Sequence, residues 1–67
     1  MKITGNTIKA KIANINGATV KRVTNDGGNR FTIYLNDIAD NFKVAYAVNR
    51  AGWKRIANNT SNICIEV

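Results

Sequence analysis

The chain has no histidine, no proline, one cysteine and four carboxylate side chains among its 67 residues. Without histidine it lacks the side chain that most often transfers protons near neutral pH, so most hydrolase designs are excluded. The lone Cys64 has isoleucine neighbours, which predict a small buried side chain rather than an activated nucleophile. The carboxylates are too few to favour a metal site. The sequence therefore predicts a protein without enzyme activity, cofactor or metal.

Long apolar runs are also missing. No segment approaches the roughly 20 apolar residues of a membrane helix, and the stretch from Met1 to Asn6 lacks the apolar core of a signal peptide. A single cysteine cannot supply the disulfides on which small secreted domains rely. We therefore expect a cytoplasmic protein that does not contact a membrane. Because no proline-rich, low-complexity or repeated segment marks a boundary, residues 1–67 are predicted to form one domain with a thin core.

Positive charge is the most distinctive property that is present. Ten lysines and arginines stand against four aspartates and glutamates, which gives a formal net charge of +6. Such a field attracts polyanions or acidic protein surfaces before contact is made. The alternative is that the charge only keeps a small protein in solution. The charge density favours a functional role.

Three segments in the first half of the chain alternate as half-buried strands do: Thr7 to Asn14, Ala18 to Thr24, and Arg30 to Asn36. Asn16-Gly17 and the stretch Asn25 to Asn29 predict the turns between them. The result is a three-stranded antiparallel meander. A three-residue first loop gathers the apolar side chains on one face: Ile8, Ile12, Val20, Phe31, Ile33 and Leu35.

The same register leaves Arg22 on the apolar face, near a strand end, and places Val23 on the outer face. In the second half of the chain, Asp37 is predicted to be an N-cap, and the pattern from Ile38 to Ala57 predicts one helix. At about 100° per residue, one arc of that helix covers the sheet. Its members are Ile38, Phe42, Ala45, Tyr46, Trp53 and Ile56, together with Asn49 and Gly52.

Two features of this second half remain open. The residues Phe42 to Val48 also alternate at period two, so a strand with a turn at Arg50-Ala51-Gly52 competes with the helix. Gly52 could also bend or split the helix. After it, Asn62 to Val67 predicts a last short strand. The predicted fold is α+β, in the order β-β-β-α-β, with the helix packed on one face of the sheet.

The predicted outer face of the meander combines cations with an aromatic ring. Its candidate binding residues are Lys9, Lys11, Lys21, Arg30 and Tyr34. Cations neutralise phosphates, and a tyrosine can stack on a base. A solvated sheet face that is merely basic is the alternative. A second candidate surface lies along the helix, and consists of Lys43, Arg50 and Lys54. Trp53 is an exposed anchor or a core residue, and its place on the apolar arc favours the core.

Two resemblances follow from these patterns. The meander and helix from Thr7 to Ala57 resemble in topology the arm-site DNA-binding domains of tyrosine recombinases and the plant ethylene-response DNA-binding domain, although the strand Ile63-Cys64-Ile65 departs from that plan. The short basic chain and the segment Trp53-Lys54-Arg55-Ile56-Ala57 look like small phage-encoded inhibitors of host defence, including anti-CRISPR proteins. The first resemblance implies a sheet that enters the major groove. The second implies a non-enzymatic protein that blocks a host defence complex.

Taken together, the sequence predicts a non-enzymatic protein that binds a nucleic acid, or a nucleoprotein complex of the host, through a basic surface. No small-molecule substrate is expected, and the chain is expected to be a monomer or a homodimer. The alternative is an inhibitor or adaptor that binds an acidic protein surface and does not touch nucleic acid.

Overall fold

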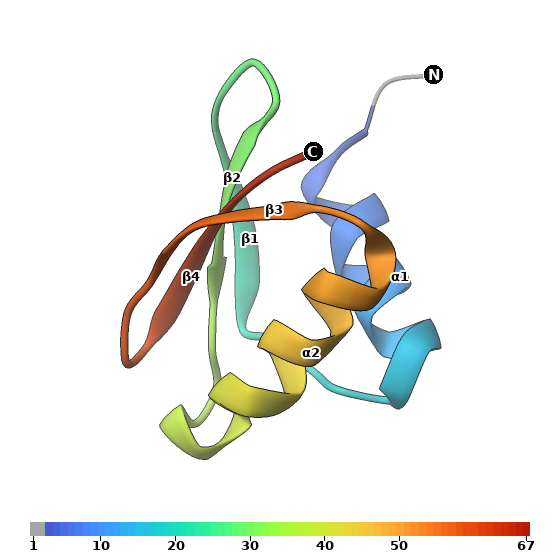
Figure 1. The fold of residues 1–67 in the computed structure, drawn as a ribbon, viewed down its shortest axis with the longest axis vertical. Coiled ribbons are helices and arrows are strands. Elements are labelled where there is room, and N and C mark those ends of the chain that lie inside the picture. The colour runs from blue at the N-terminus through green and yellow to red at the C-terminus, as the bar shows by residue number, and fades with distance from the viewer. Residues whose placement is uncertain (1–2) are drawn as a thin grey trace.

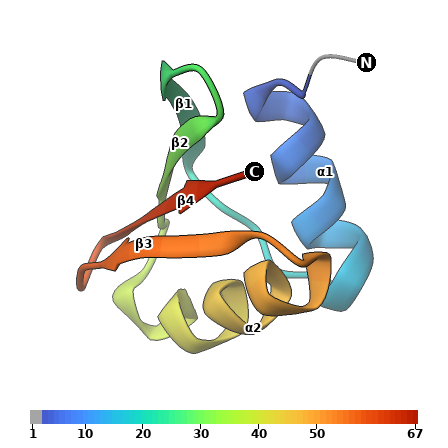
Figure 2. The same cartoon turned by 45° about the horizontal axis from the view of Figure 1, so that its top comes forward.

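The computed structural model describes residues 3–67, which form two helices packed on one side of a four-stranded antiparallel sheet (Figures 1 and 2). The strands lie in the order β1-β2-β4-β3. The elements in chain order are α1 (Gly5–Asn16), β1 (Arg22–Gly27), β2 (Arg30–Tyr34), the 3₁₀ turn η1 (Ile38–Asp40), α2 (Asn41–Ala51), β3 (Lys54–Asn58) and β4 (Asn62–Glu66). The predicted α+β class is confirmed, but the predicted order β-β-β-α-β is wrong, since a helix precedes the first strand and two strands follow α2.

The largest error concerns the first predicted strand, Thr7 to Asn14, which lies inside α1. Ile8 and Ile12 are completely buried, as predicted, although they reach the core from a helix. Residues four apart share one face of a helix and also one face of a strand, so this pair cannot separate the two structures. Ile15 separates them, because it packs against the core and continues the spacing of a helix.

The ends of α1 are specified by local hydrogen bonds. Thr4 forms a capping box with Thr7, whose backbone N–H donates to the Thr4 hydroxyl at 3.3 Å. At the other end, Gly17 has φ 75° and donates its N–H to the Ala13 carbonyl at 2.8 Å. Gly17 was predicted in the turn of a hairpin, but it terminates a helix.

The hairpin between β1 and β2 is confirmed, with its turn inside the predicted stretch Asn25 to Asn29. The strand β1 begins later than predicted, and the buried Ala18 and Val20 precede it. Its register pairs Arg22 with Tyr34 and Val23 with Ile33. Arg22 therefore faces away from the core and Val23 packs against it, opposite to the prediction.

The helix predicted after Asp37 is confirmed in its central part and wrong in its bounds. Asp37 does act as a cap, and its carboxylate accepts from the Ala39 backbone N–H at 2.9 Å. The first turn is a 3₁₀ turn, and α2 ends at Ala51, where Gly52 with φ 83° forms the C-cap. Phe42 to Val48 is helical, so the competing strand is excluded.

The orientation of α2 is also wrong in the prediction. Its buried side chains are small: Val44, Ala45, Ala47 and Val48. The large members of the predicted arc face solvent, with exposed fractions of 89% for Phe42, 60% for Ile38 and 56% for Tyr46. Small buried residues allow α2 to approach the sheet and α1 closely, and protein interiors pack too densely to admit the aromatic rings as well.

The last third of the chain forms the other half of the sheet. Lys54 to Ala57 was predicted as helix, but Lys54–Asn58 is the edge strand β3, and Ile56 is exposed there. The predicted strand at Asn62 is confirmed as β4, which pairs with both β2 and β3 and buries Ile63 and Ile65 completely. Trp53 is half-buried and packs against the core. Among the described residues, no helix is long and apolar enough to span a membrane.

Candidate functional site

The cations predicted on the sheet are dispersed over the molecule. Lys9 and Lys11 project from α1, and Lys21 precedes β1; all three are exposed. Of the five residues predicted on the outer sheet face, Arg30 and Tyr34 do lie there, on β2. The predicted grouping of lysines around Tyr34 is therefore wrong, because two of the lysines lie on a helix.

The outer face of the sheet is also largely neutralised. Arg30 Nε lies 3.8 Å from Glu66 Oε2 in an ion pair. The guanidinium of Arg22 lies 4.6 Å from the centroid of the Tyr34 ring. It therefore covers one face of the ring on which a base would otherwise stack. The Thr32 hydroxyl donates to the Asp26 carboxylate and also contacts Cys64 Sγ at 3.6 Å. This face offers few free groups to a phosphate backbone.

The solvent side of α2, unlike the outer face of the sheet, exposes aromatic rings together with cations. Phe42, Lys43, Tyr46, Asn49 and Arg50 are all exposed and share an arc of about 120° at 3.6 residues per turn. Lys43 and Arg50 belong to the second predicted surface, and the structure keeps them together; Lys54 has moved to β3. The sequence of α2 contains no carboxylate. This helix therefore presents aromatic rings and cations side by side in water.

The strand β3 adds further cations beside the helix. Lys54 and Arg55 are exposed on it, and β3 also lacks carboxylates. The register places Lys54 opposite Glu66, on the outer face with Arg30, and Arg55 opposite Ile65, on the side of α2. Asparagines join the start of α2 to the turn between β3 and β4. The Asn41 amide donates to Asn58 Oδ1 at 2.8 Å and to the Asn59 carbonyl at 2.9 Å. We call the region between the solvent side of α2 and β3 the α2–β3 seam.

Sequence reasoning missed most of this seam. Arg55 was not selected, and Phe42 and Tyr46 were assigned to the core. A signal was available: the glycine of Ala51-Gly52 marks a helix end, and ending the helix there removes Trp53 and Ile56 from its apolar arc. The remaining apolar residues then divide into a small set and an aromatic set, and only the small set suits close packing.

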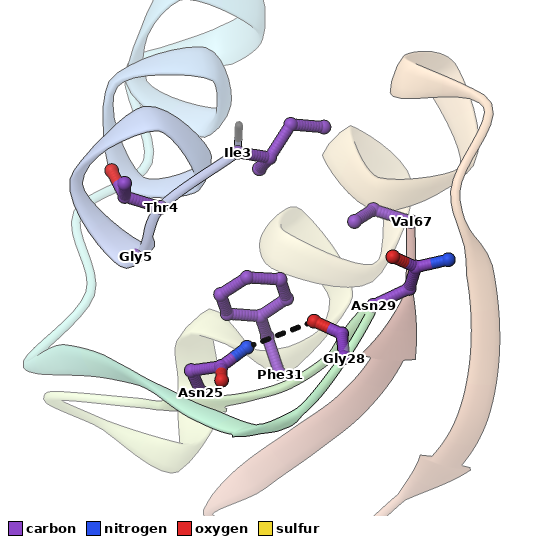
Figure 3. Close-up of a pocket in the computed structure, with 8 residues that line it drawn as sticks. All are labelled: Ile3, Thr4, Gly5, Asn25, Gly28, Asn29, Phe31 and Val67. Carbon is purple, nitrogen blue, oxygen red and sulfur yellow. Dashed lines mark hydrogen bonds between the residues drawn. The ribbon is translucent and has the colours of Figure 1, made fainter. Parts of the chain in front are cut away.

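A separate hollow of about 620 Å³ lies between the start of α1, the β1–β2 hairpin and Val67 (Figure 3). The ring of Phe31 forms its floor. The Thr4 hydroxyl already accepts a hydrogen bond in the α1 cap. The Asn25 amide donates to the Gly28 carbonyl at 3.2 Å and to the Arg30 carbonyl at 3.2 Å. Among residues 3–67, no charged side chain lines the hollow. It therefore lacks the convergent free polar groups that orient a small-molecule ligand.

Within residues 3–67 no cluster of three or more cysteine, aspartate or glutamate side chains has the geometry to hold a metal ion. Comparison of the chain with protein families, with characterised proteins and with solved structures finds no significant match. The α2–β3 seam is therefore the candidate binding site of this chain.

Proposed function

We propose that this chain is a non-enzymatic binding protein that engages a nucleic acid, or a cytoplasmic complex that handles one, through the α2–β3 seam. One observation carries the proposal: α2 exposes Phe42 and Tyr46 beside Lys43 and Arg50, without a carboxylate in the helix. Cations beside exposed aromatic rings provide both of the contacts that nucleic acids offer, to phosphates and to base faces.

The exposure of the rings supports a binding role over a purely structural one. Burying a phenylalanine side chain stabilises a protein by about 1.5–3 kcal/mol. Because Phe42 is 89% exposed, it contributes almost none of this stabilisation. Ile38 in η1 and Tyr46 in α2 are exposed on either side of Phe42 in the sequence. Contiguous exposed apolar residues with a polar surround mark interaction surfaces.

A host defence complex is the kind of partner that the resemblance to small phage inhibitors implies. The seam carries positive charge, which suits the nucleic acid of such a complex or an acidic protein surface on it. The exposed Ile38 favours the second possibility specifically, because an aliphatic side chain has no ring to stack on a base. An apolar stripe at intervals of four residues fits a groove on a protein.

Paired charge reversals test the proposal. The variant Lys43→Glu/Arg50→Glu removes four charge units from the formal +6, and so does the control Lys9→Glu/Lys11→Glu on α1. Fluorescence polarisation with labelled oligonucleotides then measures affinity against salt. The α2 pair should weaken binding about tenfold or more and reduce the salt slope by about 1.5, whereas the α1 pair should have a small effect. Equal losses from both pairs would show that net charge acts without a defined surface.

Nuclease treatment distinguishes binding to a protein surface from binding to nucleic acid. A labelled chain is used to capture partners from host lysate with and without nuclease. Capture that survives digestion, and that Lys43→Glu/Arg50→Glu abolishes, would move the function to an acidic protein surface. Capture that disappears after digestion supports direct contact with nucleic acid.

A further inference from the structure

Two hollows follow one another along the α2–β3 seam. The first, of about 580 Å³, is bordered by Ile38 and Phe42 on the helical side and by Asn58 and Asn59 on the strand side. The second, of about 470 Å³, is bordered by Trp53, Arg55 and again Asn58. Because Asn58 borders both, the hollows are consecutive, and a chain molecule could occupy them in sequence.

Each hollow has an aromatic ring at its margin. Phe42 is 89% exposed at the first, and the half-buried Trp53 lines the second. Tyr46 lies one helical turn after Phe42, about 6 Å further along the axis. Aromatic side chains at successive positions are the platforms on which the bases of a single strand stack, and this stacking tolerates any base sequence.

The polar groups around the second hollow suit an anionic chain, whereas the first hollow is lined by uncharged side chains and adjoins Asp37 and Asp40. Lys54 and Arg55 line the second hollow, and neither α2 nor β3 contains a carboxylate. The first hollow is held in shape by the Asn41 amide, and a bond between Asn41 and Asn58 exists in either orientation of the Asn58 amide. A site that is already ordered loses less conformational entropy when a ligand binds.

We propose that the α2–β3 seam binds single-stranded nucleic acid, with unpaired bases against Phe42 and Trp53 and phosphates held by Lys43, Arg50, Lys54 and Arg55; this rests on the function proposed above. The preference for a single strand has a physical reason. In a duplex the faces of the bases are stacked on one another, so rings at Phe42 and Trp53 have no access to them. The cations alone would bind duplex and single strand through phosphates.

The probes are a labelled oligo(dT) and oligo(rU) of about 16 nucleotides, with a hairpin duplex of equal charge as comparison. The unmodified chain should bind the single strands at least about tenfold more tightly than the duplex at equal salt. Trp53 is the only tryptophan, so quenching of its fluorescence on binding reports directly on the second hollow.

Two substitutions at Phe42 test whether the ring stacks. Phe42→Ala should lower single-strand affinity by about 5- to 100-fold and leave duplex affinity unchanged. Phe42→Leu keeps an apolar side chain without a ring, and it should lose nearly as much. Because Phe42 is exposed, both variants should retain the melting temperature of the parent chain, which is measured alongside.

The outcomes separate this inference from the broader proposal. Equal affinity for single strand and duplex, unaffected by Phe42→Ala, overturns the stacking site and leaves charge-driven binding intact. Full retention of single-strand affinity in Phe42→Leu also overturns it, since apolar contact would then suffice. Absence of binding to every probe overturns both the inference and direct nucleic-acid contact.

Discussion

The two helices lie on the same side of one sheet, but they distribute their side chains in opposite ways (Figure 2). In α1 the large aliphatic residues Ile8 and Ile12 are completely buried, and the exposed surface carries lysines. In α2 the buried residues are valines and alanines, and the large rings of Phe42 and Tyr46 face water. Burial of large apolar side chains stabilises a fold, and their exposure does not. The contrast indicates that α1 serves the core, whereas α2 has a solvent face suited to binding.

The largest expected effect is on the free energy of unfolding, which should fall far more for a substitution in α1 than for one in α2. Ile12→Ala removes a completely buried side chain and should lower the free energy of unfolding by about 2–5 kcal/mol. Phe42→Ala, which deletes a larger side chain, should change it by less than about 0.5 kcal/mol. Urea unfolding followed by circular dichroism measures both.

A domain of this size has a total stability of only about 3–5 kcal/mol, so Ile12→Ala could abolish the folded state altogether. The milder Ile12→Val, expected to cost about 0.5–1.5 kcal/mol, then supplies a measurable value. If Phe42→Ala destabilised the chain as much as Ile12→Val, the proposed division between a structural and a binding helix would be refuted.

A second prediction concerns the small side chains that α2 buries. Ala47→Leu adds three carbons where Ala47 has no exposed surface, and it should cost about 1–3 kcal/mol through overpacking. The matched control is Ala10→Leu, the same change at an exposed position of α1, which should stay within about 0.5 kcal/mol. A tolerated Ala47→Leu would mean that close approach of α2 does not explain why its rings are outside.

The sheet and its turns could be predicted from the sequence to a large extent. The turn around Asp26-Gly27-Gly28, the strand from Arg30 and the strand from Asn62 are all confirmed, because their alternation is supported by turn residues on one or both sides. The burial of Ile8 and Ile12 was also predicted, but from the wrong element. A spacing of four satisfies both a strand and a helix, so burial alone could not decide between them.

The candidate site could be predicted only in part. Lys43 and Arg50 were predicted to form a surface, and the structure places both on the exposed side of α2. The aromatic residues were placed in the core because hydrophobicity alone takes no account of size. Val44, Val48 and two alanines already fill the available interior, and this competition for space depends on how closely α2 meets α1 and the sheet. Such distances are a property of tertiary packing and are not encoded in a local pattern.

The smallest expected effect compares how the two helices begin. Thr4 caps α1 through its capping box, whereas Asp40, at the N-cap of α2, makes no side-chain cap bond. Thr4→Ala should therefore cost about 0.5–2 kcal/mol. Asp40→Ala loses only a favourable charge near a helix start and should cost about 0.3–1 kcal/mol at low salt, falling as salt screens the dipole. Thermal unfolding at low and high salt measures both, and a salt-independent loss in Asp40→Ala equal to that in Thr4→Ala would show that α2 depends on a cap as much as α1 does.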